Sequence, residues 1–273
     1  MGSVGRMLAH EAAQTEMSNE RQKQRAIATH SDQAGLFSER YGALVEDPYR
    51  NSFVYSRKRL NEWLDRYLPL NGSGLRLVDV GCGTGYHLRR YRERGYEISG
   101  VDGSGEMLNE AQAANPQIEF VLADVDRIPL PSAAYDAALC IEVLRYLPDI
   151  QPCLREIRRM VKPGGVALIT AAPPMQANLY PIVNRVALAV GAGNLTRLRQ
   201  YFHSARYLRQ ECARAGFSDV QIHGVYGGFS VWIDRLAPSF VRSYLRAWER
   251  VDAKIADAPG LMHFSNMFLV IAK

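Results

Sequence analysis

The sequence has few of the features that mark secreted, membrane-spanning or metal-binding proteins. Its 273 residues include four cysteines and no C-x-x-C pair, which argues against a disulfide or zinc framework. No run of about 18 uncharged apolar residues occurs, which argues against a transmembrane helix. The N-terminal segment lacks the apolar stretch of a secretory signal. These absences predict a cytoplasmic protein with reduced thiols.

Charge of one sign is only slightly in excess. The chain carries 33 basic and 28 acidic side chains, a net charge of +5, and its pI is near 9.0. This balance permits contact with nucleic acid or an anionic membrane but requires neither. The basic residues fall mostly in short clusters within helical stretches, which is typical of solvated helix faces. We therefore expect no nucleic-acid partner, do not favour peripheral membrane contact, and leave monomer and homodimer open.

Short apolar runs alternate with helical patterns along most of the chain. Strands are predicted at 76–80, 96–101, 118–123, 136–141, 166–171, 219–225 and 266–272. Strands that alternate with helices predict an α/β fold with a parallel, doubly wound sheet. Residues 1–28 are polar and lack a sustained apolar period, so we interpret them as a mobile tail or loose helix. Residues 29–273 are interpreted as a single domain.

One segment carries most of the chemical information. Residues 77–86 read LVDVGCGTGY, a buried strand that runs into a glycine turn and opens a helix. Glycines let the backbone bend tightly and let a ligand approach without a Cβ clash. The spacing is G-x-G-x-G rather than the G-x-G-x-x-G of dinucleotide enzymes. Asp102 ends the next strand, where an acid accepts hydrogen bonds from ribose hydroxyls.

With its later motifs, the sequence resembles the class I S-adenosylmethionine-dependent methyltransferases, closest to the small-molecule, ubiquinone-type group. The motifs are VDVGCGTG at 78–85, GVDGS at 100–104, ADV at 123–125, YDAA at 135–138, IEVL at 141–144 and KPGG at 162–165. The resemblance covers about residues 75–171. It implies a seven-stranded, mostly parallel Rossmann-like sheet with helical cap inserts. It also implies S-adenosylmethionine as cofactor and S-adenosylhomocysteine as product.

The resemblance assigns a first set of residues to the methionine part of this cofactor. The residues that should line it are Asp79, Gly81, Cys82, Gly83, Gly85 and Ile141. In ubiquinone-type enzymes an arginine about twenty residues before the first motif meets the cofactor carboxylate, and Arg57 is the best match. Arginine suits this role because it binds carboxylates through two parallel hydrogen bonds. Tyr41 is a further candidate, placed to close over the site.

A second set is implied for the ribose and the adenine. Asp102 should hold both ribose hydroxyls, with Gly103 beside it and Met107 packed near the adenine. Asp124 should accept from the adenine amino group, while Val125 donates its backbone N–H to a ring nitrogen. Capping of a turn is the alternative role for both aspartates.

The catalytic base is the weakest link between this sequence and a reaction. Ubiquinone-type enzymes often read E-x-x-E-H after strand four, where this chain has Glu142-Val143-Leu144-Arg145-Tyr146. No ligand pair of the metal-dependent catechol type follows strand five, so we expect no metal. Two histidines are candidate bases: His203 before a late helix, and His30 on a segment that folds over the cofactor. His87 opens the helix after the glycine loop and is expected to point away.

The acceptor has to be inferred from two inserts, at about 173–203 and 227–264. Both are rich in apolar and aromatic residues. We expect them to pack on the domain as a cap and to wall an acceptor pocket, because such pockets are largely apolar. This favours methylation of an oxygen on a sizeable, partly apolar metabolite of secondary metabolism, with nitrogen or carbon left open. The alternatives are a cofactor-binding protein that transfers no methyl group or promotes another reaction and, from the basic pI, an RNA methyltransferase.

Overall fold

The computed structural model describes residues 3–36, 47–191 and 198–273. Its centre is a seven-stranded sheet in the order β3-β2-β1-β4-β5-β7-β6. The strands are β1 (Arg76–Val80), β2 (Glu97–Asp102), β3 (Glu119–Leu122), β4 (Tyr135–Cys140), β5 (Val161–Ala171), β6 (Val220–Tyr226) and β7 (Met267–Ala272). Strand β7 is antiparallel to both β5 and β6, and the other neighbouring pairs are parallel. The prediction of a doubly wound, mostly parallel sheet is confirmed.

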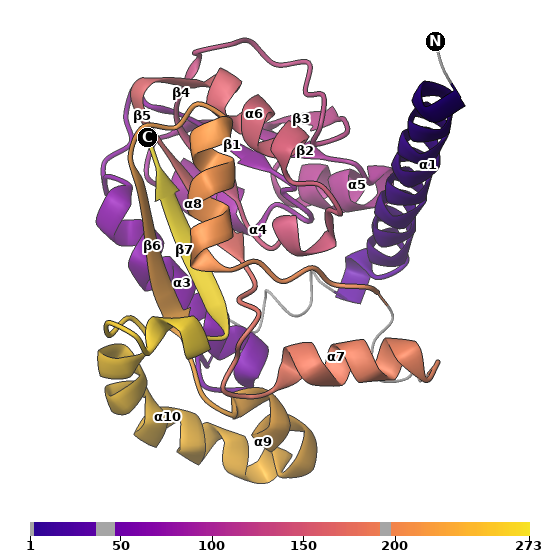
Figure 1. Cartoon of the computed structure of the whole chain (residues 1–273). Coiled ribbons are helices and arrows are strands. Elements are labelled where there is room, and N and C mark those ends of the chain that lie inside the picture. Colours follow the sequence, from indigo (N-terminus) through magenta and orange to yellow (C-terminus); the bar gives the residue numbers. More distant parts are fainter. Residues whose placement is uncertain (1–2, 37–46, 192–197) are drawn as a thin grey trace.

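Helices cover both faces of the sheet (Figure 1). They are α1 (Ser3–Ser31), α3 (Ser52–Tyr67), α4 (Tyr86–Arg92), α5 (Gly105–Ala114), α6 (Gln151–Met160), α7 (Tyr180–Ala189), α8 (Ala205–Arg214), α9 (Ser230–Leu236) and α10 (Pro238–Ile255), with short 3-10 turns η1 (Leu144–Tyr146) and η2 (Met262–Phe264). Alternate residues of β1 serve the two layers: Val78 packs in the α6 and α8 layer, and Leu77 packs in the α3 and α4 layer. This follows from the period of two along a strand.

Helix ends follow the polar residues that the sequence places there. Ser104 accepts a hydrogen bond from the Met107 N–H and caps α5, and Ser204 caps α8 in the same way. Asn51 caps α3 through Val54. Side-chain oxygens of this kind satisfy the free N–H groups of a first helical turn. Because α5 begins directly after β2, its cap also fixes the loop at this part of the carboxyl edge of the sheet.

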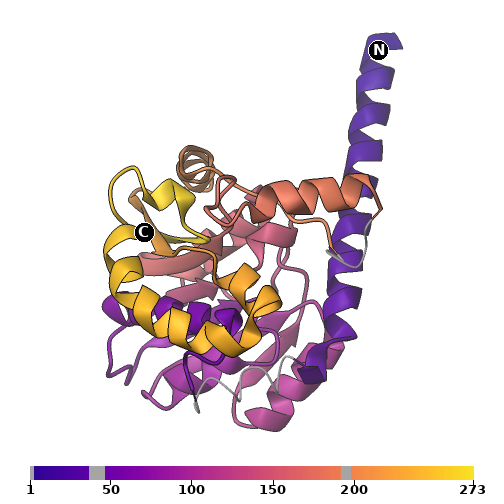
Figure 2. The same cartoon turned by 90° about the horizontal axis from the view of Figure 1, so that it is seen from below.

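Residues 3–28 of the predicted tail belong to one long helix, α1, which continues to Ser31. Its N-terminal end stands clear of the domain, and its C-terminal half runs along the body (Figures 1 and 2). The contacts of that half are specific: the Ser31 and Ser104 hydroxyls are hydrogen-bonded at 2.7 Å, and the Tyr201 hydroxyl donates to Gln22. The domain boundary at residue 28 and the mobility of the tail stay predictions.

The two inserts fold as helices at one end of the molecule. Helix α7 belongs to the first insert, and α9 and α10 belong to the second (Figure 1). The Trp232 indole N–H donates to the Asn178 carbonyl at 2.5 Å, which ties α9 to the segment before α7. No helix in the described part of the chain is long and apolar enough to cross a membrane.

Candidate cofactor site and active site

A cavity of about 370 Å³ lies at the carboxyl edge of the sheet. Its walls come from the loops after β1, β2, β3 and β4, from the C-terminal half of α1, and from the start of α3. In open α/β sheets, ligands bind in this crevice where the strand order reverses. The cavity therefore occupies the position at which a nucleotide-like ligand is expected.

The three loop glycines differ in what surrounds them. All have positive φ, at 76° for Gly81, 53° for Gly83 and 79° for Gly85, a region that residues with a Cβ rarely adopt. A Cβ on Gly81 would lie 2.2 Å from the Val143 side chain, whereas one on Gly83 would meet nothing within 4 Å. Gly83 therefore leaves open space beside the cavity. Gly85 is not among the residues that line the cavity, and a Cβ there would meet Ala111 of α5 and Asn115 after it; its contact with the cofactor stays a prediction.

Asp79 is a buried carboxylate at the end of β1. It is 1% exposed, lines the cavity, and neither of its oxygens has a hydrogen-bond partner in the described part of the chain. Burial, with a smaller contribution from nearby Asp102, raises its pKa to about 7. An isolated buried acid is costly unless a cation or a donor approaches it. Asp79 is therefore arranged to receive a positively charged or hydrogen-donating group from a ligand.

Asp102 faces the glycine loop from the end of β2. Its Oδ2 accepts from the Gly83 N–H at 2.8 Å, and its Oδ1 accepts from the Ser104 N–H at 2.9 Å. Burial raises the pKa of Asp102, and these two N–H groups partly offset the effect. A carboxylate has about four acceptor positions, so these bonds leave Asp102 with acceptor capacity for a hydroxyl donor. Gly103 and Met107 line the cavity beside it, as expected.

Helix α1 contacts Asp124, the third acid predicted to bind the cofactor, through the side chain of Lys23. The Lys23 ammonium lies 2.6 Å from Asp124 and 2.8 Å from Asp126. Burial would lower the pKa of Lys23, but these carboxylates and Glu20 reverse the effect and raise it. Lys23 is therefore charged when α1 is docked. Sequence reasoning missed this residue, because a lysine in a polar helix carries no signal until the acids it meets are known.

Charged residues gather in the wall of the cavity that follows β4. Glu142 forms ion pairs with Arg145 and, at 3.8 Å, with Arg57. Burial would raise the pKa of Glu142, but Arg145 and Arg57 hold it below its usual value. The backbone of Glu142 has a φ of 64°, and its N–H donates to the Thr170 hydroxyl at 2.7 Å. This acid is charged and fixed, so it is poorly suited to exchange protons.

The two candidate histidine bases lie in different places. His30 lines the cavity, and its Nδ1 lies 2.7 Å from the Ala26 carbonyl. A carbonyl only accepts, so Nδ1 carries the hydrogen and, in the neutral ring, Nε2 carries the lone pair. His203 does not line the cavity and stacks on Tyr207. The geometry favours His30.

Most of the residues predicted to bind the cofactor line this one cavity. Besides those above, Cys82, Val125, Ile141 and Arg57 line the cavity. Tyr41 lies outside the described residues. His87 was expected to point away, but it lines the cavity, and burial lowers its pKa to about 3. The described residues contain no cluster of three metal-ligating side chains.

The inserts do not form the predicted walls of this cavity. No described residue beyond Leu147 lines it. The first insert meets the site indirectly, because the Arg145 guanidinium donates to Gln200 at 2.8 Å and the Tyr201 N–H donates to the Arg145 carbonyl at 2.8 Å. The expectation of an insert-walled pocket is therefore not met in this cavity.

The sheet order and this cavity define a Rossmann-like methyltransferase domain of class I. The site fits S-adenosylmethionine: an unpartnered buried acid, open space beside Gly83 and a second acid with acceptor positions left. Residues 78–169 match the family model Methyltransf_11, described as a methyltransferase domain. The chain thus contains a domain of the S-adenosylmethionine-dependent methyltransferases.

Comparison with individual proteins gives the same class. The chain is 36% identical over 108 residues to a malonyl-acyl-carrier-protein O-methyltransferase of Serratia marcescens, over 39% of this chain and 42% of that protein. It is 33% identical over 127 residues to a ubiquinone biosynthesis O-methyltransferase of Paracidovorax citrulli, over 44% and 52% of the two chains. The matched region spans about half the length of these relatives. An S-adenosylmethionine-dependent methyltransferase from Mesorhizobium loti has the same fold, with a TM-score of 0.56, 23% identity, and coverage of 77% of this chain and 95% of that one.

Proposed function

We propose that this protein transfers the methyl group of S-adenosylmethionine to an oxygen of a small, partly apolar molecule. The observation that carries the proposal is the single cavity that holds both halves of the required chemistry. Asp79, Gly83 and Asp102 form its cofactor side, and His30 stands on the opposing helix α1. The two relatives named above are both O-methyltransferases, which supports oxygen as the methylated atom.

The residues of the chain supply binding, charge and a proton acceptor. Asp79 and Arg57 would hold the amino and carboxyl groups of the cofactor, Asp102 its ribose, and Asp124 and Val125 its adenine. When bound, the cofactor supplies an electrophilic methyl group on a sulfonium. Removal of a proton from the acceptor hydroxyl by His30 Nε2 makes the oxygen a stronger nucleophile. Docking of α1 over the cavity excludes water and fixes the acceptor near the methyl group, which contributes much of the acceleration.

A labelled-methyl assay tests this proposal. The full chain is incubated with S-adenosylmethionine labelled in the methyl group and with a panel of phenols, hydroxyquinones and carboxylic acids, each paired with its O-methylated form. A matched set of primary and secondary amines is tested beside them. We expect label in at least one free oxygen compound and in none of the blocked partners. Calorimetric binding of S-adenosylhomocysteine without transfer to any hydroxyl, carboxyl or amine would instead support a cofactor-binding protein. Transfer to amines alone would contradict the assignment of oxygen.

A further inference from the structure

Most of the large apolar side chains that the structure leaves exposed belong to the two inserts. In α7, Ile182 and Val186 lie one turn apart and are 60% and 54% exposed, and Val190 at its end is 70% exposed. In the second insert, Phe229, Leu236 and Phe240 are 51%, 81% and 58% exposed. We call these six residues, with the helices that carry them, the insert face.

The helices of the insert face lie together. Figures 1 and 2 show α7, α9 and α10 at one end of the molecule, and the hydrogen bond from Trp232 to Asn178 joins α9 to the start of the α7 segment. The inward side of α7 is already used, because Pro181, Asn184 and Ala187 are buried. Large apolar side chains that stay exposed on neighbouring elements are typical of an interaction site.

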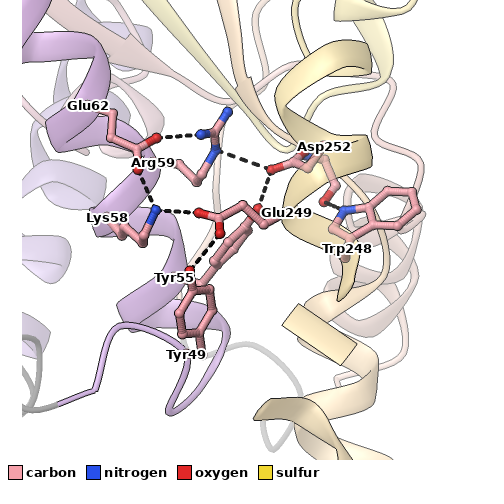
Figure 3. A network of polar contacts seen from close by, with 9 residues as sticks. Tyr49, Tyr55, Lys58, Arg59, Glu62, Trp248, Glu249 and Asp252 are labelled. Atoms are coloured by element: carbon pink, nitrogen blue, oxygen red, sulfur yellow. Dashed lines mark hydrogen bonds and ion pairs between the residues drawn. The ribbon is translucent and has the colours of Figure 1, made fainter. Parts of the chain in front are cut away.

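The acidic residues of this region are turned inward. Glu249 and Asp252 of α10 face α3 and the turn before it: the Tyr49 hydroxyl in that turn donates to Glu249, and the Tyr55 hydroxyl in α3 donates to Asp252, both at 2.6 Å (Figure 3). Asp234 of α9 accepts from the Ser52 N–H at 3.0 Å. Residues 172–191 contain no Asp or Glu. The carboxylates of the inserts are therefore engaged by the body of the domain.

The basic residues of the same helices remain at the surface. Arg185 in α7, Arg235 in α9, and Arg246 and Arg250 in α10 are all exposed. None of the four forms an ion pair with a carboxylate in the described part of the chain. The insert face thus combines large apolar side chains with uncompensated positive charge.

We infer that the insert face docks on an anionic lipid bilayer. Apolar side chains of an amphipathic surface enter the boundary between headgroups and acyl chains, and basic residues at the same level gain from the negative surface potential. An uncharged partner would not use the cations, and a second copy of this chain would place positive faces together. This surface is separate from the cofactor cavity, so the inference does not depend on methyl transfer.

Vesicle sedimentation tests the inference with the full chain. We expect binding to equimolar phosphatidylglycerol and phosphatidylcholine vesicles, weak binding to pure phosphatidylcholine, and loss of binding in high salt. Ile182→Ser with Val186→Ser should weaken binding at least about tenfold, because two apolar anchors are lost. Arg185→Glu with Arg235→Glu should weaken it by a similar factor.

Matched controls make the result specific. Leu70→Ser with Leu122→Ser removes apolar side chains that are 71% and 63% exposed elsewhere, and Arg92→Glu with Arg155→Glu reverses two exposed arginines outside the inserts. Both controls should bind as the parent does. Absence of binding to the vesicles that contain phosphatidylglycerol would overturn the inference. Equal binding by the insert variants and the control variants would overturn it too. So would a dimer in light scattering that Ile182→Ser with Val186→Ser dissociates, because a second copy would then cover the face.

Discussion

The cofactor cavity and the insert face use apolar and charged residues in opposite ways. At the cavity, the Asp79 carboxylate is buried and has no hydrogen-bond partner in the described part of the chain, and the neighbouring backbone is held in glycine turns. At the insert face, the carboxylates accept hydrogen bonds from tyrosine hydroxyls of the domain body, and large apolar side chains are exposed. The cavity suits a small polar ligand. The insert face suits a lipid bilayer, which has an apolar interior and negatively charged headgroups. We therefore expect the two regions to bind different partners.

The largest effect on this comparison should come from His30→Asn. Removing the proton acceptor should lower kcat for an oxygen acceptor by roughly a hundred- to ten-thousand-fold, while binding of S-adenosylhomocysteine should change little. Steady-state kinetics with the acceptor found in the labelled-methyl screen, together with calorimetry, separate the two quantities. His203→Asn is the matched control, because His203 does not line the cavity. An unchanged kcat in His30→Asn would remove His30 from catalysis.

The next largest effect is expected in the pH dependence of the affinity for S-adenosylhomocysteine, which should follow the titration of Asp79. Its pKa of about 7 in the free protein should fall when a cationic group binds beside it. Affinity for S-adenosylhomocysteine should then drop by up to about tenfold per unit as the pH decreases below 7, and level off above it. Calorimetry across this range checks the slope. The Asp79→Asn variant should bind weakly at every pH and lose the slope, whereas a sloping profile in that variant would assign the titration to another group.

Asp79 should also affect stability in the opposite direction to binding. Its pKa is raised above the ordinary 3.8, so its stabilising contribution is full below about pH 4 and is lost as the pH rises through 7. The free energy of unfolding lost by pH 8 has an upper limit of about 4 kcal/mol. Thermal melts of the ligand-free chain at pH 8 should therefore show Asp79→Asn to be the more stable protein. A lower melting temperature in the variant would show that the carboxylate has a structural partner.

A smaller effect is expected at Lys23. Lys23→Met removes the ion pairs with Asp124 and Asp126, so α1 should dock less firmly and release of S-adenosylhomocysteine should accelerate several-fold. Each partly exposed ion pair contributes about 1 kcal/mol or less. Stopped-flow release and hydrogen exchange over residues 20–31 measure the two consequences. Arg25→Met is the control on the same helix, because Arg25 is exposed. Equal rates in both variants would show that α1 does not retain the cofactor.

No effect at all is expected from metal removal. The described residues offer no cluster of metal-ligating side chains, and Glu142 is paired with two arginines. Methyl transfer should therefore be the same before and after dialysis against EDTA. Loss of activity in EDTA that magnesium restores would contradict this, and Glu142 would be the first ligand to examine.

The sequence was most informative where backbone geometry and ligand chemistry restrict the residue. Gly83 was expected from the tight turn and Asp102 from the acid that a ribose requires at the end of the second strand, whereas Asp79 was assigned through the resemblance of the motif. Ser104 was predictable as a helix cap for a similar local reason. The sequence alone does not separate Gly83 from Gly85, because a positive φ has the same glycine signature whether the glycine faces a ligand or packs on α5.

Long-range pairings carry no such local signal. Lys23 meets Asp124 and Asp126 across about a hundred residues, and nothing in the polar sequence of α1 distinguishes it from its exposed neighbours. The inserts were predicted to wall an acceptor pocket because such pockets are largely apolar. Ile182, Val186 and Leu236 instead lie at the surface, and composition alone does not say whether an apolar residue faces a core, a ligand or a membrane.

The central claim is that the cavity between the sheet edge and α1 binds S-adenosylmethionine through Asp102. Calorimetric titration of the full chain with S-adenosylhomocysteine at pH 8 tests it most directly, with Asp102→Ala compared with the parent. The account predicts one site per chain and a loss of roughly 1–3 kcal/mol of binding free energy in the variant, because the ribose hydroxyls lose their acceptor. No binding by the parent, or equal affinity in the two proteins, would contradict it.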